Sequence, residues 1–386
     1  MQLPAITQAL DMGLDVVVVD MNPNAVGFEE PGIVKAVVST IDKEAVLQVA
    51  QENRIDGIMT LASDMPMQTV AYVSEKMHLV GPDSETALKA TNKAYMRDAL
   101  KAGGVPIPFY QKVSNEAEYA AATARFPESF IVKPADSSGS RGICLVTDAA
   151  DKQEVADAYV YAKQYARSGT VLVEEVMRGP EVSVETMSLD GKCFVIQITD
   201  KLTTGAPHFV ETGHSQPSAL ALNIKRQIEK AAIAANAAIG IRNGPSHTEI
   251  IVTKDGPKIV EIGARLGGDC ITTHLTPLST GVNMVRACIE IALGIRPQIG
   301  KQYDKGAAIR YFRQIPGQIQ SVDFVDQAKK MRGIREISIV HGVGETVGEI
   351  CDSTSRMGFV IAQDDTAAEA IRDCEEALDT IHIDII

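Results

Sequence analysis

The sequence lacks several features that would quickly assign it to a class of protein. Its six cysteines include no CxxC pair, and no His/Cys cluster has the spacing of a zinc site. This pattern argues against a disulfide scaffold or a zinc ribbon and is typical of reduced thiols in a cytosolic protein. No apolar run reaches the roughly 18 residues of a membrane span, and the first residues lack the basic start and apolar core of a signal peptide. We therefore expect a cytoplasmic protein without a membrane partner.

Positive charge is also scarce. The 386 residues include 37 Lys and Arg against 50 Asp and Glu, which gives a formal net charge of −13. Nucleic-acid binding needs a basic surface, so this balance argues against nucleic acid as a partner. It does not exclude an anionic small molecule, because a few lysines, arginines, backbone N–H groups and a metal ion can concentrate positive charge locally.

The glycine-rich motifs of P-loop proteins and dehydrogenases are missing too, yet a different glycine-rich segment is present. Residues 136–142 (DSSGSRG) lie between two predicted strands, 130–134 and 143–147, rather than between a strand and a helix. Small residues let successive backbone N–H groups turn toward an anion, and the serines add hydroxyl donors. Lys133, just before the segment, would place a charge on the same phosphates. The alternative interpretation is a flexible surface hairpin.

Strand-like and helix-like patterns alternate along the chain, which predicts an α/β protein. Near the N-terminus, apolar runs at 15–20, 34–39 and 55–61 alternate with helical stretches at 42–53 and 64–76, as in βαβ units on a parallel sheet. The sequence begins in what reads as the first helix, so this Rossmann-like domain is expected to lack its first strand, through truncation or an incomplete edge. Three regions are predicted: 1–90, then 91–300 with a small subdomain at about 105–175 and a larger one at about 176–300, and an α+β region at 301–386.

Two acidic residues on neighbouring predicted strands form the sharpest feature. Glu249 shares a strand face with His247, because side chains alternate with a period of two. If residues 254–256 form a three-residue hairpin loop, Glu249 lies opposite Glu261 on the same face, whereas a two-residue loop would put them on opposite faces. Like charges this close favour a cation between them, and Mg²⁺ that bridges carboxylates to phosphates fits. The alternative is two solvated acids on an exposed face.

Two further segments carry polar groups without a motif of their own. The strand end at 173–177 and Glu181 could hold an adenine ring on backbone groups and ribose hydroxyls on the acid, or could be an ordinary strand–turn–strand. The segment 201–217 contains His208, Glu211 and His214 and has little secondary-structure signal. It is predicted to be a mobile lid or substrate loop, with ordinary surface histidines as the alternative.

Taken in chain order, these parts resemble the ATP-grasp superfamily of carboxylate–amine ligases, over nearly the whole chain. The matching parts are Asn92-Lys93, residues 131–134, 137–142, 174–177 with Glu181, Glu249, and 261–265. Residues 207–217 and 263–269 are most similar to the branch of L-amino-acid ligases (dipeptide synthetases). The resemblance implies an ATP-grasp fold with a pre-ATP-grasp N-terminal domain and a carboxylase-like C-terminal region.

The resemblance also implies roles for individual residues. Those assigned to the ATP phosphates are Lys93, Lys133, Ser137, Ser138, Gly139, Ser140 and Gly142. Those assigned to adenine and ribose are Glu174, Glu175, Val176, Met177 and Glu181. Glu249 and Glu261 would hold Mg²⁺ (or Mn²⁺), while Arg265 and Lys133 would be catalytic, with Arg265 on the acyl-phosphate. The candidate substrate contacts are His208, Glu211, His214, His247 and Gly268. Many family members have Asn where this chain has Gly263, so a metal would have one ligand fewer, or take one from His247.

The expected activity is therefore an ADP-forming ligation in which a carboxylate, from an amino acid, is activated by ATP and joined to an amine. A bicarbonate-activating enzyme, similar to biotin carboxylase or carbamoyl-phosphate synthase, is the first alternative. A nucleotide-binding regulatory protein without turnover is the second. A dehydrogenase is the weakest, since the fingerprint glycines are absent. The family resemblance further implies a homodimer, and the sequence names neither substrate.

Overall fold

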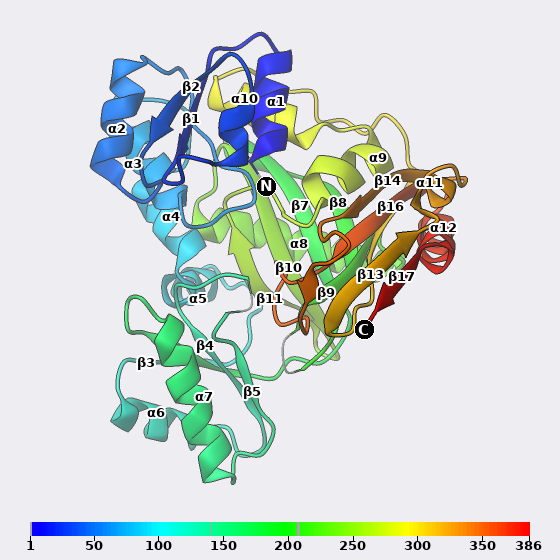
Figure 1. Ribbon diagram of the computed structural model, residues 1–386. Coiled ribbons are helices and arrows are strands. Elements are labelled where there is room, and N and C mark those ends of the chain that lie inside the picture. The colour runs from blue at the N-terminus through cyan, green and yellow to red at the C-terminus, as the bar shows by residue number, and fades with distance from the viewer. Residues whose placement is uncertain (1, 140, 207–208) are drawn as a thin grey trace.

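The computed structural model describes residues 2–139, 141–206 and 209–386, and their strands form four sheets (Figure 1). The predicted site residues Ser140 and His208 lie outside the described residues. Helices combine with parallel and antiparallel strands, which confirms the α/β class. None of the helices that the described residues form has both the length and the apolar character needed to cross a bilayer.

The N-terminal region contains a two-stranded parallel sheet flanked by helices. Its elements are α1 (Leu3–Asp11), β1 (Val16–Asp20), the 3₁₀ turn η1 (Val26–Glu29), β2 (Ile33–Val37), α2 (Lys43–Glu52), α3 (Met67–Met77) and α4 (Ser84–Thr91). The strands predicted at 15–20 and 34–39 are confirmed as the β1–β2 pair. The strand predicted at 55–61 is wrong. Leu61 there exchanges hydrogen bonds with the side-chain amide of Gln2, which takes the place of a neighbouring strand.

The next region is an antiparallel four-stranded sheet in the order β3-β6-β4-β5. Its elements follow α5 (Lys93–Ala102) and are β3 (Tyr110–Val113), α6 (Glu116–Thr123), β4 (Phe130–Pro134), β5 (Cys144–Val146), α7 (Lys152–Tyr165) and β6 (Val171–Glu175). It has its own apolar core, in which Tyr159 of α7 packs with Phe130 and Val132 of β4. The predicted loop 136–142 connects β4 and β5, as expected.

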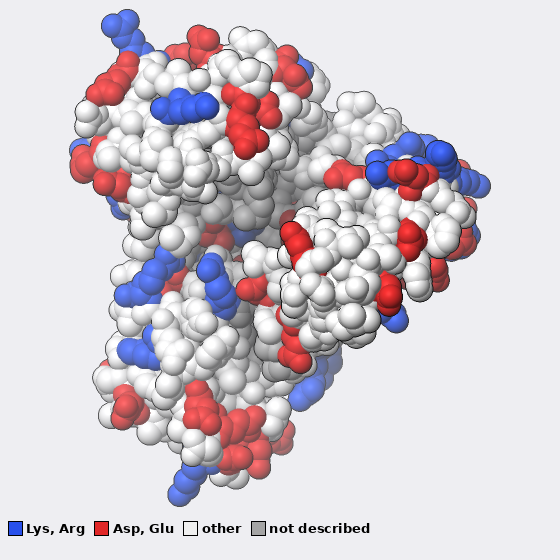
Figure 2. All heavy atoms as spheres, in the orientation of Figure 1, with Lys and Arg blue, Asp and Glu red and all other residues white. Residues whose placement is uncertain are grey.

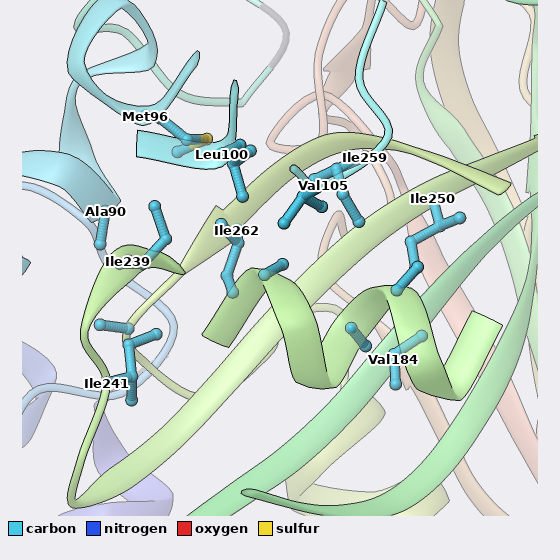
Figure 3. Packing of buried hydrophobic residues seen from close by; sticks show 14 of the residues in the cluster. Ala90, Met96, Leu100, Val105, Val184, Ile239, Ile241, Ile250, Ile259 and Ile262 are labelled. Carbon is cyan, nitrogen blue, oxygen red and sulfur yellow. The ribbon is translucent and has the colours of Figure 1, made fainter. Parts of the chain in front are cut away.

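An antiparallel eight-stranded sheet forms the centre of the molecule, in the order β11-β10-β7-β8-β9-β12-β16-β14 (Figure 1). The strands of its first part are β7 (Glu181–Leu189), β8 (Lys192–Thr203), β9 (Glu211–Gln216), β10 (Gly244–Thr253) and β11 (Gly256–Gly263). The helical elements are α8 (Leu222–Ile239), the π-helical turn η2 (Ile271–Leu275), α9 (Thr276–Thr280) and α10 (Met284–Ala292). Figure 3 shows how apolar side chains of α8, α5 and the β10–β11 hairpin meet under the sheet, including Ile239, Leu100 and Ile262. Full burial of such a side chain contributes about 1.5–3 kcal/mol, so the hairpin is firmly backed.

The C-terminal region extends this central sheet. Its elements are β12 (Gly306–Tyr311), β13 (Gly317–Asp323), α11 (Val325–Ala328), β14 (Ile334–Ile339), β15 (Thr346–Val347), β16 (Gly358–Asp364), α12 (Ala367–Thr380) and β17 (His382–Ile385). Three of these strands form a separate small sheet, β15-β13-β17. Helix α12 begins with a capping box that Thr366 and Glu369 form.

One sequence prediction about the central sheet is wrong. The segment 201–217 was expected to be a mobile lid, but Glu211–Gln216 forms the interior strand β9, between β8 and β12. The strand has no apolar alternation, and its buried side chains include His214, Ser215 and Gln216, some of whose polar atoms bond to neighbouring residues. Gln216 donates hydrogen bonds to the hydroxyls of Thr199, at 2.8 Å, and Thr276, at 3.1 Å. A buried polar network thus stabilises a strand that hydrophobic patterning does not reveal.

Candidate active site

The β10–β11 hairpin carries the acidic pair and sets its register. The turn is a two-residue loop that pairs Thr253 with Gly256, so the predicted three-residue loop is wrong. Continued unchanged, this register would place Glu249 opposite Val260. A β-bulge at Val260 adds one residue to β11 and restores the pairing of Glu249 with Glu261. The predicted alignment of the two carboxylates on one face is confirmed, although a bulge produces it rather than the turn.

The bulge also connects to a buried ion cluster formed by Arg97, Lys133 and Glu174, here the Glu174 cluster. Arg97 donates one hydrogen bond to the carbonyl of Val260 at 2.7 Å, and two to the Glu174 carboxylate at 2.7 and 3.0 Å. Lys133 Nζ lies 2.7 Å from the other side of that carboxylate. All three side chains are almost completely buried, so α5, β4, β6 and β11 meet at this one cluster.

The Glu174 cluster contains two cations for one carboxylate, and the pKa values reflect this imbalance. Burial, with Arg97 and Lys93 nearby, lowers the pKa of Lys133 to about 8 despite its contact with Glu174. Burial also opposes the ionisation of Glu174, but Arg97 and Lys133 outweigh it and lower its pKa to about 2. The cluster therefore keeps its carboxylate ionised and holds an excess of positive charge.

A second buried cluster, the Lys201 cluster, has the opposite balance. Lys201 Nζ lies 2.9 Å from Glu181, 3.2 Å from Glu211 and 3.1 Å from Glu249. Burial alone would lower the pKa of Lys201, but the three carboxylates raise it well above the usual value. Burial and the neighbouring Glu249 raise the pKa of Glu181, whereas Lys201 and His247 hold that of Glu249 well below its usual range against the effect of burial. One cation thus serves three carboxylates.

A cavity of about 420 Å³ lies where the N-terminal region, the four-stranded sheet and the central sheet meet. Figure 2 shows this face hollowed between the upper and lower parts of the molecule, with basic and acidic atoms at the rim. Its lining includes Lys93, Ser137, Ser138, Asp64 and Glu261. Lys93, at the start of α5, donates to the carbonyl of Ser137 at 2.9 Å and contacts Glu261 at 2.8 Å. Although burial opposes it, Glu261 raises the pKa of Lys93.

Arg265 follows β11 directly and reaches the N-terminal region. Its guanidinium binds the Asp64 carboxylate through Nε at 2.8 Å and Nη2 at 3.2 Å, and donates to the carbonyl of Leu266 at 3.1 Å. Burial opposes the charge of both partners, but each stabilises the other, so the pKa of Asp64 is lowered and that of Arg265 raised. This pair connects two regions at the edge of the cavity.

Two histidines of the predicted site are buried against carboxylates. Glu185, fully buried on β7, lies 2.6 Å from Nδ1 of His247, and Glu249 lies 3.6 Å from Nε2. Burial disfavours the charged ring, but Glu185 and Glu249 raise the pKa of His247 to about 10. His214 is also buried, with Nε2 3.2 Å from the carboxylate of Asp269.

Asp269 is in turn held by the C-terminal region. Arg356 binds both of its oxygens, at 2.7 and 2.9 Å, and its guanidinium lies 3.8 Å from the ring centroid of Tyr311. Asp269 and the next residue, Cys270, both have positive φ, 51° and 60°, a conformation that few residues other than glycine adopt. Gly268, just before them, lies beside Ala62 of the N-terminal region.

The remaining predicted residues that the structure describes do not line this cavity. Gly139 and Gly142 of the 136–142 loop have φ of +66° and +78°, and a Cβ at Gly142 would come within 2.9 Å of Tyr165. Glu175 pairs with Lys258 at a different hollow, while Val176 and Met177 lie in the connection between β6 and β7. The loop thus needs glycine at its two left-handed positions.

Comparisons with known proteins fit this architecture. Residues 126–273 match the family of ATP-grasp domains, and residues 310–385 match the family described as L-amino acid ligase C-terminal domain 2. The chain therefore contains an ATP-grasp domain. This domain is combined with a C-terminal domain of the kind described for L-amino acid ligases.

The ATP-grasp chain is also similar to individual proteins. It is 29% identical over 331 residues to an uncharacterized protein of Sinorhizobium fredii, covering 84% of this chain and 67% of that one. Alanine–anticapsin ligase of Bacillus subtilis is 29% identical over 248 residues, 58% of this chain and 51% of its own length, so the chain matches about half of that relative. The crystal structure of an L-amino acid ligase from Bacillus licheniformis has a TM-score of 0.84 at 23% identity, covering 100% of this chain and 96% of that one, a likeness of fold.

The residues of this ATP-grasp site fit a divalent cation with few protein ligands. Glu249 and Glu261 face each other and keep side-chain exposures of 18% and 24%. Within the described ranges no group of three or more His, Cys, Asp or Glu side chains is placed to hold a metal. A cation bound here would therefore take its other ligands from water and phosphates, which is the habit of Mg²⁺.

Sequence reasoning missed three residues of the site: Arg97, Lys201 and Asp64. A signal existed for Arg97, because it lies four residues after Lys93 on a predicted helix and so on the same face. Lys201 meets acids at positions 181, 211 and 249, which come together only once the strand order is known. Asp64 contacts a residue 201 positions away. No local pattern reveals either contact.

Proposed function

We propose that this protein is an ATP-dependent, ADP-forming ligase that activates the carboxylate of an amino acid as an acyl-phosphate and joins it to an amine. The observation that supports this most is the convergence at one cavity of Lys93, the start of the 136–142 loop, Asp64 and Glu261, with Arg265 bound to Asp64 and Glu249 paired with Glu261 beside it. A site with cations on one side and carboxylates on the other can bind a phosphate chain and a divalent ion together.

The nucleotide would bind between the four-stranded sheet and the central sheet. Lys93, Lys133 and the loop with Ser137 and Ser138 supply donors to its phosphates. We assign the backbone of 175–177 to adenine and Glu181 to ribose. The Glu174 carboxylate is already bound by Arg97 and Lys133, so its part in this proposal is to orient Lys133 rather than to face the base.

Glu249 and Glu261 would hold Mg²⁺ (or Mn²⁺), which when bound neutralises charge on the phosphoryl group in transfer. In the described structure a lysine stands beside each acid, Lys201 beside Glu249 and Lys93 beside Glu261. Both lysines have to turn from these acids toward the phosphates as the nucleotide and metal enter. Because the metal ion replaces the lysine ammonium groups, Glu249 and Glu261 stay neutralised throughout.

The chemistry proceeds in two displacements. A substrate carboxylate oxygen forms a bond to the γ-phosphorus as the bond to ADP breaks, and Lys93 and Lys133 stabilise the charge on the transferred group. The amine nitrogen then attacks the acyl carbon, the bond to phosphate breaks, and the amine gives up a proton. Arg265 stabilises the oxyanion of this second step. Closure of the 136–142 loop excludes water, which would otherwise hydrolyse the acyl-phosphate.

The acidic side of the site favours an amino acid over bicarbonate. Glu211, one of three carboxylates around Lys201, supplies negative charge for a substrate ammonium group. Bicarbonate has no ammonium group to use such a site. A homodimer and a cytoplasmic location complete the proposal; the second is supported by six cysteines that are all free.

Turnover with defined substrates tests the proposal. Purified protein with Mg-ATP is incubated with pairs of amino acids while ADP, phosphate and the amide product are measured. We expect ADP and phosphate in equal amounts with the amide. Release of AMP and pyrophosphate would overturn the mechanism, a requirement for bicarbonate would favour the carboxylase-like alternative, and nucleotide binding without turnover for any pair would favour a regulatory protein.

A further inference from the structure

The contact between Asp64 and Arg265 crosses from the N-terminal region to the central sheet. Two nearly parallel hydrogen bonds join the carboxylate to the guanidinium, through Nε and Nη2, and a third runs from Nη1 to Leu266. A guanidinium has five N–H donors. Among the described residues these bonds use three donors, so two remain for a ligand in the cavity.

Asp64 is itself held firmly in place. Its carbonyl accepts a hydrogen bond of 3.1 Å from Met67 at the start of α3. Three residues earlier, Leu61 is buried and bound at both its N–H and its carbonyl by the Gln2 side chain. Between them Ala62 has a φ of +49°, so the chain turns sharply just before it enters the cavity. The carboxylate is therefore presented from a fixed segment.

Gly263 lies two residues before Arg265, at the position where many members of the family have Asn. Its surroundings explain why this chain differs there. A Cβ added at Gly263 would lie 3.2 Å from Oδ1 of Asp64 and 3.3 Å from Nε of Arg265. These distances are tighter than ordinary contacts, and the crowded atoms belong to a two-bond ion pair that cannot move freely. The φ of Gly263 is not in the left-handed region. Glycine here thus avoids crowding of the ion pair, and the backbone conformation does not demand it.

We propose that Asp64 is a positioning residue that aligns Arg265 for the reacting acyl group. We also propose that the absence of a side chain at Gly263 leaves room for the Asp64–Arg265 ion pair. The proposal rests on the proposed function in one respect, the role of Arg265. The bond pair fixes the plane of the guanidinium and, with the bond to Leu266, leaves two of its five donors available among the described residues. Alignment of this kind matters because a misplacement of about 1 Å can cost about 100-fold in rate.

The shared space is tested without turnover by a double-mutant cycle on thermal stability. The four proteins are wild type, Gly263→Ala, Asp64→Ala and the double variant. We expect Gly263→Ala to lower the Tm of the wild type clearly and to lower that of Asp64→Ala much less, since the crowding partner is then gone. Equal shifts in the two backgrounds would overturn the assignment of Gly263.

The alignment of Arg265 is tested by kinetics of Asp64→Asn, which keeps the shape and removes the charge. We expect kcat to fall by about 10- to 100-fold while KM for ATP and the affinity for Mg-ADP stay near wild type. Asp56→Asn, an exposed acid of the same region, is the matched control and is expected to leave all three unchanged. The kcat of the Arg265→Lys variant should fall little further when Asp64→Asn is added, because Asp64 and Arg265 act as a unit.

The outcomes distinguish a failure of the positioning role of Asp64 from a failure of the proposed ligase function. Wild-type kcat in Asp64→Asn, or an equal loss of kcat and of Mg-ADP affinity, would overturn the positioning role while leaving the ligase proposal intact. If the wild type releases no ADP with any substrate pair, the proposed function fails, and the stability cycle still decides whether Asp64 and Gly263 share their space.

Discussion

The Glu174 cluster and the Lys201 cluster are built from the same kinds of side chain with opposite charge balance. The first has two cations and one carboxylate, the second one cation and three carboxylates, and both are largely buried. A buried cluster with an excess of one charge attracts a ligand of the opposite charge, because the excess is costly away from water. The first cluster is therefore suited to an anion such as phosphate and the second to a cation such as an ammonium group.

The two lysines show the difference most directly. The pKa of Lys133 is lowered to about 8 by burial beside other cations, whereas the pKa of Lys201 is raised well above its usual value by three acids. The same side chain thus holds its proton weakly in one cluster and tightly in the other. Charge balance, rather than burial alone, separates them.

The largest expected effect is on the positive side of the comparison. Lys133→Ala removes a cation that we propose to contact the phosphates and leaves Glu174 with Arg97 alone. We expect turnover to fall by about 10³-fold and the affinity for Mg-ATP to fall with it, as measured by ADP release and calorimetry. Lys112→Ala, on the exposed strand β3, is the control and should behave as wild type. Wild-type activity of Lys133→Ala would refute the assignment.

A comparable effect on stability is expected when the negative cluster loses its cation. Lys201→Met leaves Glu181, Glu211 and Glu249 without their shared partner, which should cost about 3–5 kcal/mol of unfolding free energy. Because Glu249 is also one of the two proposed metal ligands, Mn²⁺ should restore much of the lost Tm in this variant and change the Tm of the wild type less. A Tm unaffected by Mn²⁺ would count against the metal assignment.

A smaller effect is expected from pH. Lys133 is charged below its pKa of about 8 and loses its proton as the pH rises through that value. Because kcat/KM for ATP reports the free enzyme, it should fall about tenfold per pH unit above about 8. Lys133→Arg, which stays charged, should move this descending limb to higher pH. An unchanged limb in the arginine variant would assign it to another group.

The smallest effect is expected from removing one acid of the negative cluster. Glu211→Gln keeps the shape and lowers the charge excess by one. We expect KM for the amino-acid substrate to rise about tenfold, as for the loss of one hydrogen bond to a charged group, with KM for ATP near wild type. An equal rise in both would show that Glu211 acts on the whole site rather than on the ammonium group.

The order of elements and the carboxylate pair could be predicted because their signals are local. Apolar runs fix β1, β4 and β6, and the alternation around Glu249 identifies its face. The pairing of Glu249 with Glu261 was predicted from a turn that does not form, and the bulge at Val260 that produces it depends on Arg97. A bulge stabilised by a residue 163 positions away leaves no trace in the strand sequence.

Other parts could not be predicted because tertiary contacts override local patterns. Strand β9 is polar throughout and forms because Thr199 and Thr276 bind its glutamine. The run 55–61 has apolar residues but forms no strand. At its end, the side-chain amide of Gln2 forms the hydrogen bonds to the backbone N–H and carbonyl of Leu61 that a neighbouring strand would otherwise form. In both cases the partner of the backbone or side chain, rather than hydrophobic periodicity, decides the outcome.

In the β10–β11 hairpin, the number of residues in the turn and in the bulge at Val260 decides which face of the sheet each acid occupies. The two-residue turn and the single extra residue together keep both glutamates on one face, so a change of one residue in either feature reverses the face of one acid. Substitutions at residues 254, 255 and 260 are tolerable as long as the count is preserved. Insertions and deletions in related sequences should therefore occur here in compensating pairs, and loop-grafting experiments on this hairpin must conserve length before chemistry.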